Sequence, residues 1–159
     1  FFQAEDGIRA SSTSRGLGDV YKRQTPNSLP FKMKTTTNMP ADFRKYGKLI
    51  FNLNDEQHSL TVYENLDYVG VDGYENYLFL PFLDQTNGYE TYGGGRYIDL
   101  YQYENDSIII NFNRAYNPKC VYDENFSCPI VPRDNLLNLR VEAGVKNFVK
   151  NYKSYLIVR

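Results

Sequence analysis

The 159-residue chain carries 18 Lys and Arg residues against 19 Asp and Glu residues, which gives a formal net charge of −1 with its one histidine neutral. A nearly balanced charge lacks the basic excess that binding to a phosphate backbone needs, so nucleic acid is not an expected partner. No apolar run approaches the ~20 residues of a membrane-spanning helix, so the sequence predicts no membrane span.

Residues 1–24 differ in character from the rest of the chain. The stretch DVYKRQ can be back-translated into the transposon end used in sequencing libraries, and QAEDGIR resembles a translated flow-cell primer. A natural polar tail of this composition would also be disordered. We expect residues 1–24 to be an adapter-derived artefact without order, residues 25–150 to form a single β-rich domain that has lost its natural N-terminus, and residues 151–159 to be a tail.

Alternating apolar residues predict a hairpin, and a continuous apolar run predicts a further strand, in the middle of the chain. Apolar residues alternate in KLIFNLN and in HSLTVYEN, and the polar residues 54–57 between these two segments suit a turn. Residues 77–84, YLFLPFLD, are apolar on both faces, which is typical of an interior strand of a sandwich or barrel. Pro81 cannot donate a ladder hydrogen bond and indicates an edge or a bulge at that point.

Residues 96–103 and 107–114 are predicted to form a second hairpin, connected by residues 104–106. A three-residue connection pairs apolar with apolar and polar with polar side chains, whereas a two-residue connection mixes them on both faces. The preferred register places four apolar side chains on one face, those of Ile98, Leu100, Ile110 and Phe112. It gathers four polar and aromatic side chains on the other face, those of Tyr97, Asp99, Asn111 and Asn113.

The remainder of the chain has little periodicity. Residues 115–137 contain three prolines and are typical of a long ordered loop. A strand at residues 139–141 and a short helix that begins near Val145 are expected to follow. The predicted fold class is mainly β, an antiparallel sandwich or partly open barrel with a long Pro-rich loop and a short C-terminal helix.

Three consecutive glycines, residues 93–95, stand directly before Arg96 and suggest a phosphate-binding loop. Such loops open a helix, and a Walker-type loop also needs Lys followed by Ser or Thr. Here the glycines run into a predicted strand. We therefore favour the interpretation that they permit positive φ angles or a bulge at the entry to that strand.

The two cysteines and the single histidine limit the possible chemistry. The spacing of Cys120 and Cys128 matches no common zinc pattern, so we expect no metal site and no cofactor. A disulfide and a pair of reduced thiols both fit the sequence, and we favour the disulfide. Nothing in the sequence places His58 near a nucleophile, which argues against a Ser-His-Asp arrangement.

Three long blocks carry a family resemblance: FLPFLDQTNGYETYGGGRYIDL, INFNRAYNPKCVYDENFSCPIVPRDN and VEAGVKNF. They resemble the signature blocks of the bacterial family called domain of unknown function 1684, and TPNSLPFKMKTTT resembles its Bacteroidetes-type version. The resemblance runs from about Thr25 to Phe148 and implies a compact, mainly β domain without a settled activity. Many relatives have Glu where this chain has Val145, so a role of that acid does not carry over. An export or lipoprotein signal is common in similar proteins, which implies an extracytoplasmic location and agrees with a disulfide.

The polar face of the second hairpin is the candidate site of a module that binds a small polar ligand or a cell-envelope component. Arg114 either joins a buried ion pair with Glu90 or Asp99, or contacts an anionic or sugar-like ligand. A hydrolase that uses Glu90 or Asp99 as its general base is one alternative, and a purely structural or interaction domain is another. The candidate ligand-binding residues are Glu90, Tyr92, Arg96, Tyr97, Asp99, Asn111, Asn113, Arg114, Tyr116 and Asn117.

Overall fold

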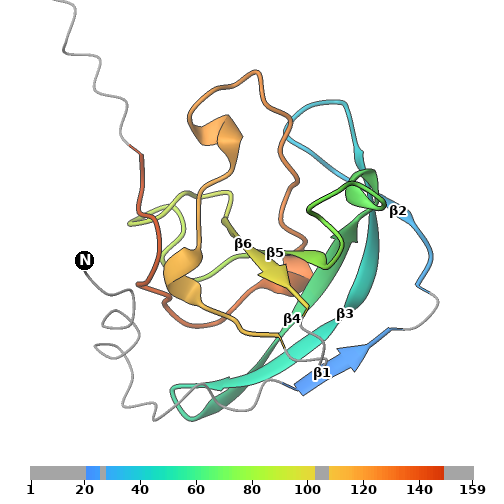
Figure 1. Cartoon of the computed structure of the whole chain (residues 1–159). Coiled ribbons are helices and arrows are strands. Elements are labelled where there is room, and N and C mark those ends of the chain that lie inside the picture. The colour runs from blue at the N-terminus through green and yellow to red at the C-terminus, as the bar shows by residue number, and fades with distance from the viewer. Residues whose placement is uncertain (1–20, 26–27, 103–107, 149–159) are drawn as a thin grey trace, which may run out of the picture.

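The computed structural model describes residues 21–25, 28–102 and 108–148, which build one six-stranded antiparallel sheet (Figure 1). The strands are β1 (Tyr21–Gln24), β2 (Phe31–Met33), β3 (Ala41–Leu53), β4 (Glu56–Asn65), β5 (Tyr77–Phe82) and β6 (Arg96–Tyr101). Their order is β1-β3-β4-β5-β6, and β2 also pairs with β3. The sheet curls so that the long β3–β4 hairpin wraps around β5 and β6, which confirms the mainly β, partly open barrel.

The helical segments of the described chain are four single 3₁₀ turns: η1 (Leu66–Tyr68), η2 (Phe112–Arg114), η3 (Lys119–Val121) and η4 (Arg133–Asn135). In the described part of the chain, no helix has the length and apolar character that crossing a membrane would require. Residues 1–20 and 151–159 lie outside the described residues, and β1 falls at the end of the segment expected to be adapter-derived. The origin of that segment stays a prediction.

The β3–β4 hairpin forms as predicted, with a shorter turn. Leu53 pairs with Glu56, so the turn consists of Asn54 and Asp55 alone, and Gln57 lies in β4. The φ angles of Asn54 and Asp55 are 53° and 61°. Asn and Asp tolerate this left-handed conformation, which matches the right-handed twist of the two strands.

Pro81 lies in an interior strand, because β5 pairs with β4 on one side and with β6 on the other. Tyr97, its partner on β6, exchanges both backbone hydrogen bonds with Tyr116, so the Pro81–Tyr97 pair carries no ladder bond. The carbonyl of Pro81 instead accepts a 2.7 Å hydrogen bond from the side-chain amide of Asn135. The same amide bonds Thr61 of β4 through Thr61 N at 2.9 Å and Thr61 O at 2.8 Å. A buried side chain thus adds hydrogen bonds between β4 and β5, whose registered ladder consists of the Tyr63–Phe79 pair.

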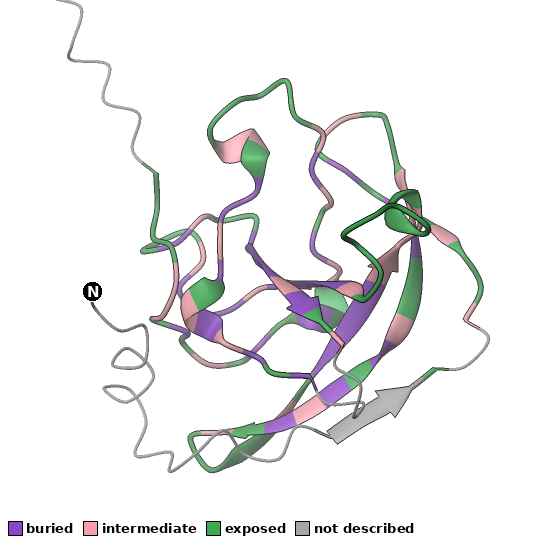
Figure 2. Ribbon diagram, in the orientation of Figure 1, coloured by how far each residue is buried: buried purple, intermediate pink, exposed green. Residues whose placement is uncertain are grey.

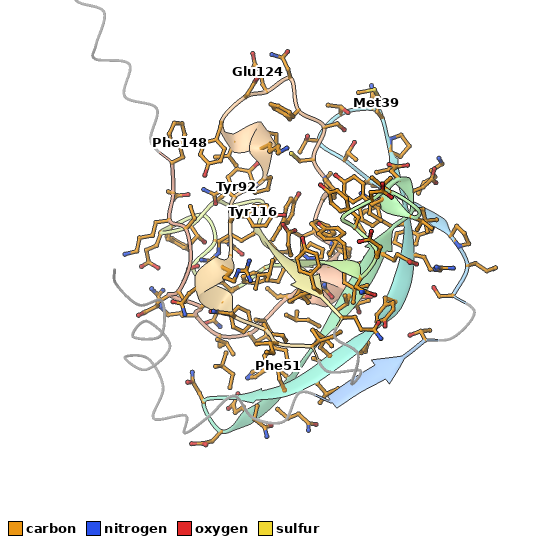
Figure 3. All side chains as sticks on the ribbon, in the orientation of Figure 1. Met39, Phe51, Tyr92, Tyr116, Glu124 and Phe148 are labelled. Carbon is orange, nitrogen blue, oxygen red and sulfur yellow. The ribbon has the colours of Figure 1, made fainter. Side chains whose placement is uncertain are left out.

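Two cores lie on opposite faces of the sheet, whose central strands are largely buried (Figure 2). The larger core contains Phe51, and the smaller one, rich in aromatic rings, borders Tyr116. Figure 3 shows these two residues on opposite sides of β6. The larger core also contains Ile98, Leu100, Ile110 and Phe112, the four residues predicted to share a face.

The prediction of a second hairpin is wrong, because its first strand forms as β6 and its second strand does not form. The predicted connection, residues 104–106, lies outside the described residues, and residues 108–111 form no strand. Tyr97 pairs with Tyr116 instead of Asn113. The reason is local, since the side chain of Asn111 accepts a hydrogen bond from Asn113 N at 3.1 Å and caps the 3₁₀ turn η2. Asn side chains that bond the nearby backbone compete with ladder formation.

The C-terminal predictions are also corrected. Residues 139–141 form no strand, and residues 145–148 are not helical, while the rest of the expected helix lies outside the described residues. The backbone carbonyls of Val141 and Ala143 would accept backbone hydrogen bonds in a strand or helix. Here they accept hydrogen bonds from the Arg96 side chain instead. Val145 N donates to the carbonyl of Ala115.

Candidate functional site

The loop before β6 is built on Asp84, a buried carboxylate directly after β5. Its Oδ1 accepts hydrogen bonds from Thr86 N at 2.7 Å and Thr86 Oγ1 at 2.5 Å. Its Oδ2 accepts a 2.7 Å bond from Arg96 Nη2. Thr86 Oγ1 also lies 2.8 Å from Thr91 Oγ1, so the turn is held by a buried network. Buried charges of this kind are tolerated when they are paired and hydrogen-bonded.

Arg96, one of the predicted ligand-binding residues, is instead fully buried. Its guanidinium donates to Val141 O at 2.7 Å and to Ala143 O at 2.6 Å, and it lies 5.3 Å from the centre of the Phe82 ring. Arg96 therefore ties the C-terminal segment to the sheet. Its charge is neutralised by Asp84, and it is not accessible to a ligand.

The glycines before Arg96 have a steric role, which confirms their structural interpretation at Gly95. Gly95 has a φ of 90°, a conformation that residues with a Cβ rarely adopt. A Cβ at Gly95 would lie 2.6 Å from the carbonyl oxygen of Phe82 and 2.7 Å from Val131 Cγ2. The loop turns tightly against β5 and leads into a strand.

Glu90 lies apart from the predicted polar face. Its carboxylate is exposed and forms a 2.6 Å ion pair with Arg140, so Arg114 is not its partner. A general base needs a position beside bound substrate, usually in a site that excludes water. An exposed carboxylate that is paired with arginine does not provide this environment.

Several other predicted site residues serve packing. Tyr97 is buried, and its hydroxyl donates to the carbonyl of Pro129. Asn117 is buried, and its Nδ2 donates to Lys146 O at 3.1 Å. Tyr92 is half-buried, and burial raises the pKa of its hydroxyl. None of these three side chains lines the pocket described below.

The disulfide prediction is wrong, because Cys120 and Cys128 are both free thiols. Cys120 N donates to Cys128 Sγ over 3.1 Å. Burial raises the pKa of the Cys128 thiol to about 11, so this group is neutral at physiological pH. Among the residues that the structure describes, no three His, Cys, Asp or Glu side chains converge as metal ligands would.

Asp99 is the predicted residue with the most distinctive surroundings. It projects from β6, and its Oδ1 accepts hydrogen bonds from Tyr77 Oη at 2.8 Å and from Tyr116 Oη at 2.7 Å. Burial raises the pKa of both tyrosines, and the charge of Asp99 raises it further. Both hydroxyls therefore stay protonated and orient the carboxylate.

Asp99 lines a pocket of about 200 Å³ along the edge of β6. The polar and aromatic lining comes from Asp99, Tyr101, Asn111 and Arg114. Ile109 adds an exposed apolar side chain, whereas the side chains of the other two lining residues, Ile98 and Leu100, are buried in the larger core. The structure thus brings together Asp99, Asn111 and Arg114 of the predicted set. Asn113 supports the pocket from behind, since its Nδ2 donates to Asn111 Oδ1 at 3.1 Å.

A group of four tyrosines beside this pocket was missed by the sequence predictions. The tyrosine cluster consists of Tyr68, Tyr74, Tyr77 and Tyr101, with Tyr77 at its centre. Tyr101 could have been found, because it follows Tyr97 and Asp99 at alternate positions of one strand. Tyr68 and Tyr74 come from the β4–β5 loop and carry no periodic signal.

The comparisons with known proteins are consistent with this fold. No curated protein matches the chain. The solution NMR structure of an uncharacterized protein of Haloarcula marismortui is similar, with 27% sequence identity and a TM-score of 0.64, over 83% of this chain and 71% of that chain. The model of the family described as protein of unknown function (DUF1684) matches residues 18–146, most of the chain. The chain therefore belongs to the DUF1684 family, as its signature blocks indicated.

Proposed function

We propose that this domain is a non-catalytic binding module whose pocket at the edge of β6 takes a small polar ligand. The observation that carries the proposal is the meeting of Asp99, Asn111 and Arg114 around one pocket. These side chains offer a carboxylate acceptor, an amide and a guanidinium donor within a small space. A few convergent polar groups beside apolar walls are typical of small-molecule sites.

The two charged groups of the pocket are available for a ligand. The Oδ1 atom of Asp99 is occupied by two tyrosine hydroxyls, whereas no described side chain donates to its Oδ2. Arg114 is exposed, and it forms no ion pair with a described residue. A ligand with one donor and one acceptor, such as an amide or a hydroxylated ring, would satisfy both groups.

The hydrolase alternative has less support. Glu90 is exposed and paired with Arg140, and Asp99 Oδ1 is committed to two tyrosines that hold it in place. These contacts suit a fixed hydrogen-bond acceptor better than a group that takes up and releases a proton.

An extracytoplasmic location of the protein stays a proposal. The free thiols of Cys120 and Cys128 remove the disulfide that would have supported it.

The test is a ligand screen with pocket variants. Thermal-shift and NMR titrations would cover sugars, amino sugars, amino acids and dipeptides. For any ligand that binds the parent, Asp99→Asn and Arg114→Gln are expected to weaken affinity about tenfold each, since one charge-assisted hydrogen bond contributes about 1.5–3 kcal/mol. Arg133→Gln, at an exposed arginine of η4 outside the pocket, is the matched control and should bind like the parent.

Two outcomes would reject the binding module. One is a screen in which no compound shifts the melting temperature of the parent. The other is a ligand whose affinity is unchanged in both pocket variants. Either outcome would favour the structural-domain alternative, in which the signature residues serve only to fold the chain.

A further inference from the structure

The tyrosine cluster exposes aromatic surface next to the pocket. Tyr68, Tyr74 and Tyr101 are 37%, 39% and 42% exposed. Their ring centres lie 5.5, 5.4 and 5.9 Å from that of Tyr77. The rings of Tyr68 and Tyr74 lie 4.4 Å apart at an interplanar angle of 33°. Exposure of large aromatic rings to water is energetically unfavourable. A contiguous group of partly exposed rings is therefore typical of an interaction site.

The loop that presents Tyr68 and Tyr74 is built by its own hydrogen bonds. Asn65 caps η1 through a 3.0 Å bond from Asp67 N to its side chain. Val71 N donates to Tyr68 O at 3.2 Å, and Tyr74 N donates to Val71 O at 3.1 Å. Residues 67–76 are nevertheless exposed, as the green loop after β4 in Figure 2 shows. The backbone that carries these rings is therefore organised by bonds within the loop, and a preformed backbone lowers the entropic cost of binding.

The cluster and the pocket form one continuous surface. Tyr101 belongs to both, since it lines the pocket and contacts Tyr77. Asp99 also links them, because it lines the pocket and accepts the hydroxyl hydrogen bond of Tyr77. Burial is the main cause of the raised pKa of Tyr68, and the charges of Tyr74 and then Asp99 add to it, which agrees with this proximity.

Building on the proposed binding function, we infer that the ligand is an oligosaccharide of N-acetylated amino sugars, with one acetamido group in the pocket and adjoining sugar rings on the tyrosine cluster. An acetamido group matches the pocket in three respects. Its N–H can donate to Asp99, its carbonyl can accept from Arg114, and its methyl group can contact the exposed side chain of Ile109. The C–H face of a sugar ring suits the electron-rich face of a tyrosine.

Other ligand classes fit this surface less well. A lipid or an apolar peptide would cover the tyrosines and desolvate Asp99 Oδ2 and the Arg114 guanidinium without offering either a hydrogen-bond partner. A nucleic acid would bring phosphate groups next to the Asp99 carboxylate, and the chain has no basic excess to compensate, with a net charge of −1. A sugar chain combines polar edges with apolar faces, as the surface does.

The experiment is a calorimetric and NMR titration with three probes: N-acetylglucosamine, chitotetraose and cellotetraose. The tetramers share their linkage, and only chitotetraose carries acetamido groups. We expect chitotetraose to bind at least about tenfold more tightly than cellotetraose and than N-acetylglucosamine. Tyr74→Ala should weaken chitotetraose about fivefold or more and leave N-acetylglucosamine unchanged, because Tyr74 contacts only the adjoining rings.

Two control variants show whether an effect of Tyr74→Ala on binding comes from loss of the aromatic ring. Tyr74→Phe retains the ring and should bind like the parent, and Tyr89→Ala, at a tyrosine that is 82% exposed and outside the cluster, should have no effect. Equal affinities for chitotetraose and cellotetraose would overturn the acetamido assignment. Binding that depends on Arg114 but is unaffected by Tyr74→Ala would overturn the role of the tyrosine cluster and leave the proposed function standing. Binding that is unaffected by Arg114→Gln and Asp99→Asn would overturn both.

Discussion

Two arginines of this chain form similar ion pairs in opposite environments. The side chains of Arg96 and Asp84 are 0% exposed, whereas those of Arg140 and Glu90 are 46% and 48% exposed. A buried charge that loses its partner has no water to replace it, whereas an exposed charge is solvated at once. The contribution of an arginine here depends on burial and on the carbonyls around it rather than on the length of its ion pair.

We expect Arg96→Met to lower the free energy of unfolding by about 3–5 kcal/mol, because it leaves the Asp84 carboxylate buried without its partner. Arg140→Met, the matched control, should cost about 1 kcal/mol or less. Urea denaturation of the two variants and the parent measures both effects. Similar small losses in the two variants would contradict the role assigned to Arg96.

At the scale of elements, the junction of β4 and β5 depends on a residue that belongs to neither strand. Asn135 of η4 is fully buried and bonds the backbone of Thr61 and Pro81 through its side chain. Its own backbone also accepts a 2.8 Å bond from Leu83 N. The Pro-rich segment therefore completes the sheet and is not simply a loop on its surface.

Asn135→Ala is expected to lower the free energy of unfolding by roughly 3 kcal/mol or more, because Thr61 N, Thr61 O and Pro81 O lose their partners in a buried place. Asn138→Ala, at an exposed asparagine three positions later, should change it by less than about 0.5 kcal/mol. Hydrogen exchange gives a second readout, since the Thr61 amide should exchange faster in Asn135→Ala. A Thr61 amide that keeps its protection would refute this assignment.

The parts of the fold that were predictable are those with a local signal. Alternation identified the β3–β4 hairpin and the strand β6, where the same pattern found Asp99, and a continuous apolar run identified β5. Alternation at Ile108 and Ile110 could not distinguish a strand from a buried segment that pairs with no strand. The side chain of Asn111 ends any pairing there, because it caps the 3₁₀ turn η2. The burial of Arg96 was not predictable, because its acceptor at Val141 lies 45 positions away. The tyrosine cluster was not predictable for the same reason, because it needs the β4–β5 loop to lie beside β5 and β6.

Across the whole molecule, one cysteine thiol and several tyrosine hydroxyls are buried in their neutral, protonated form. Burial raises the pKa of the Cys128 thiol to about 11 and that of the Tyr63 hydroxyl to about 12. It also raises the pKa of Tyr77, Tyr97 and Tyr116. The folded protein therefore holds these protons more tightly than the unfolded chain does, and the difference is confined to alkaline pH.

We expect the free energy of unfolding to fall as the pH rises above about 9. The unfolded chain releases its Cys128 and Tyr63 protons near their ordinary pKa values of 9.0 and 10.0, whereas the folded protein holds them until about 11 and 12. This stability is fully present below pH 9 and is lost as the pH passes through the folded-state values. Urea denaturation at a series of alkaline pH values measures the slope.

Tyr63→Phe should reduce that slope between about pH 10 and pH 12, because it removes one of the titrating groups. Tyr89→Phe, at an exposed tyrosine, is the control and should leave the slope unchanged. A free energy of unfolding that stays constant from pH 9 to pH 11 would show that the buried hydroxyls and the thiol do not control alkaline stability.

The tether between Arg96 and the C-terminal segment has a consequence for synthesis of the chain. The strands β5 and β6 emerge from the ribosome well before Val141 and Ala143, whose carbonyls receive the guanidinium. Until those residues are available, Asp84 can accept from Nη2, but burial of Arg96 would leave Nη1 without an acceptor, which disfavours closing the sheet around it. Closure of the sheet around Arg96 is therefore expected only after Val141 and Ala143 have been translated.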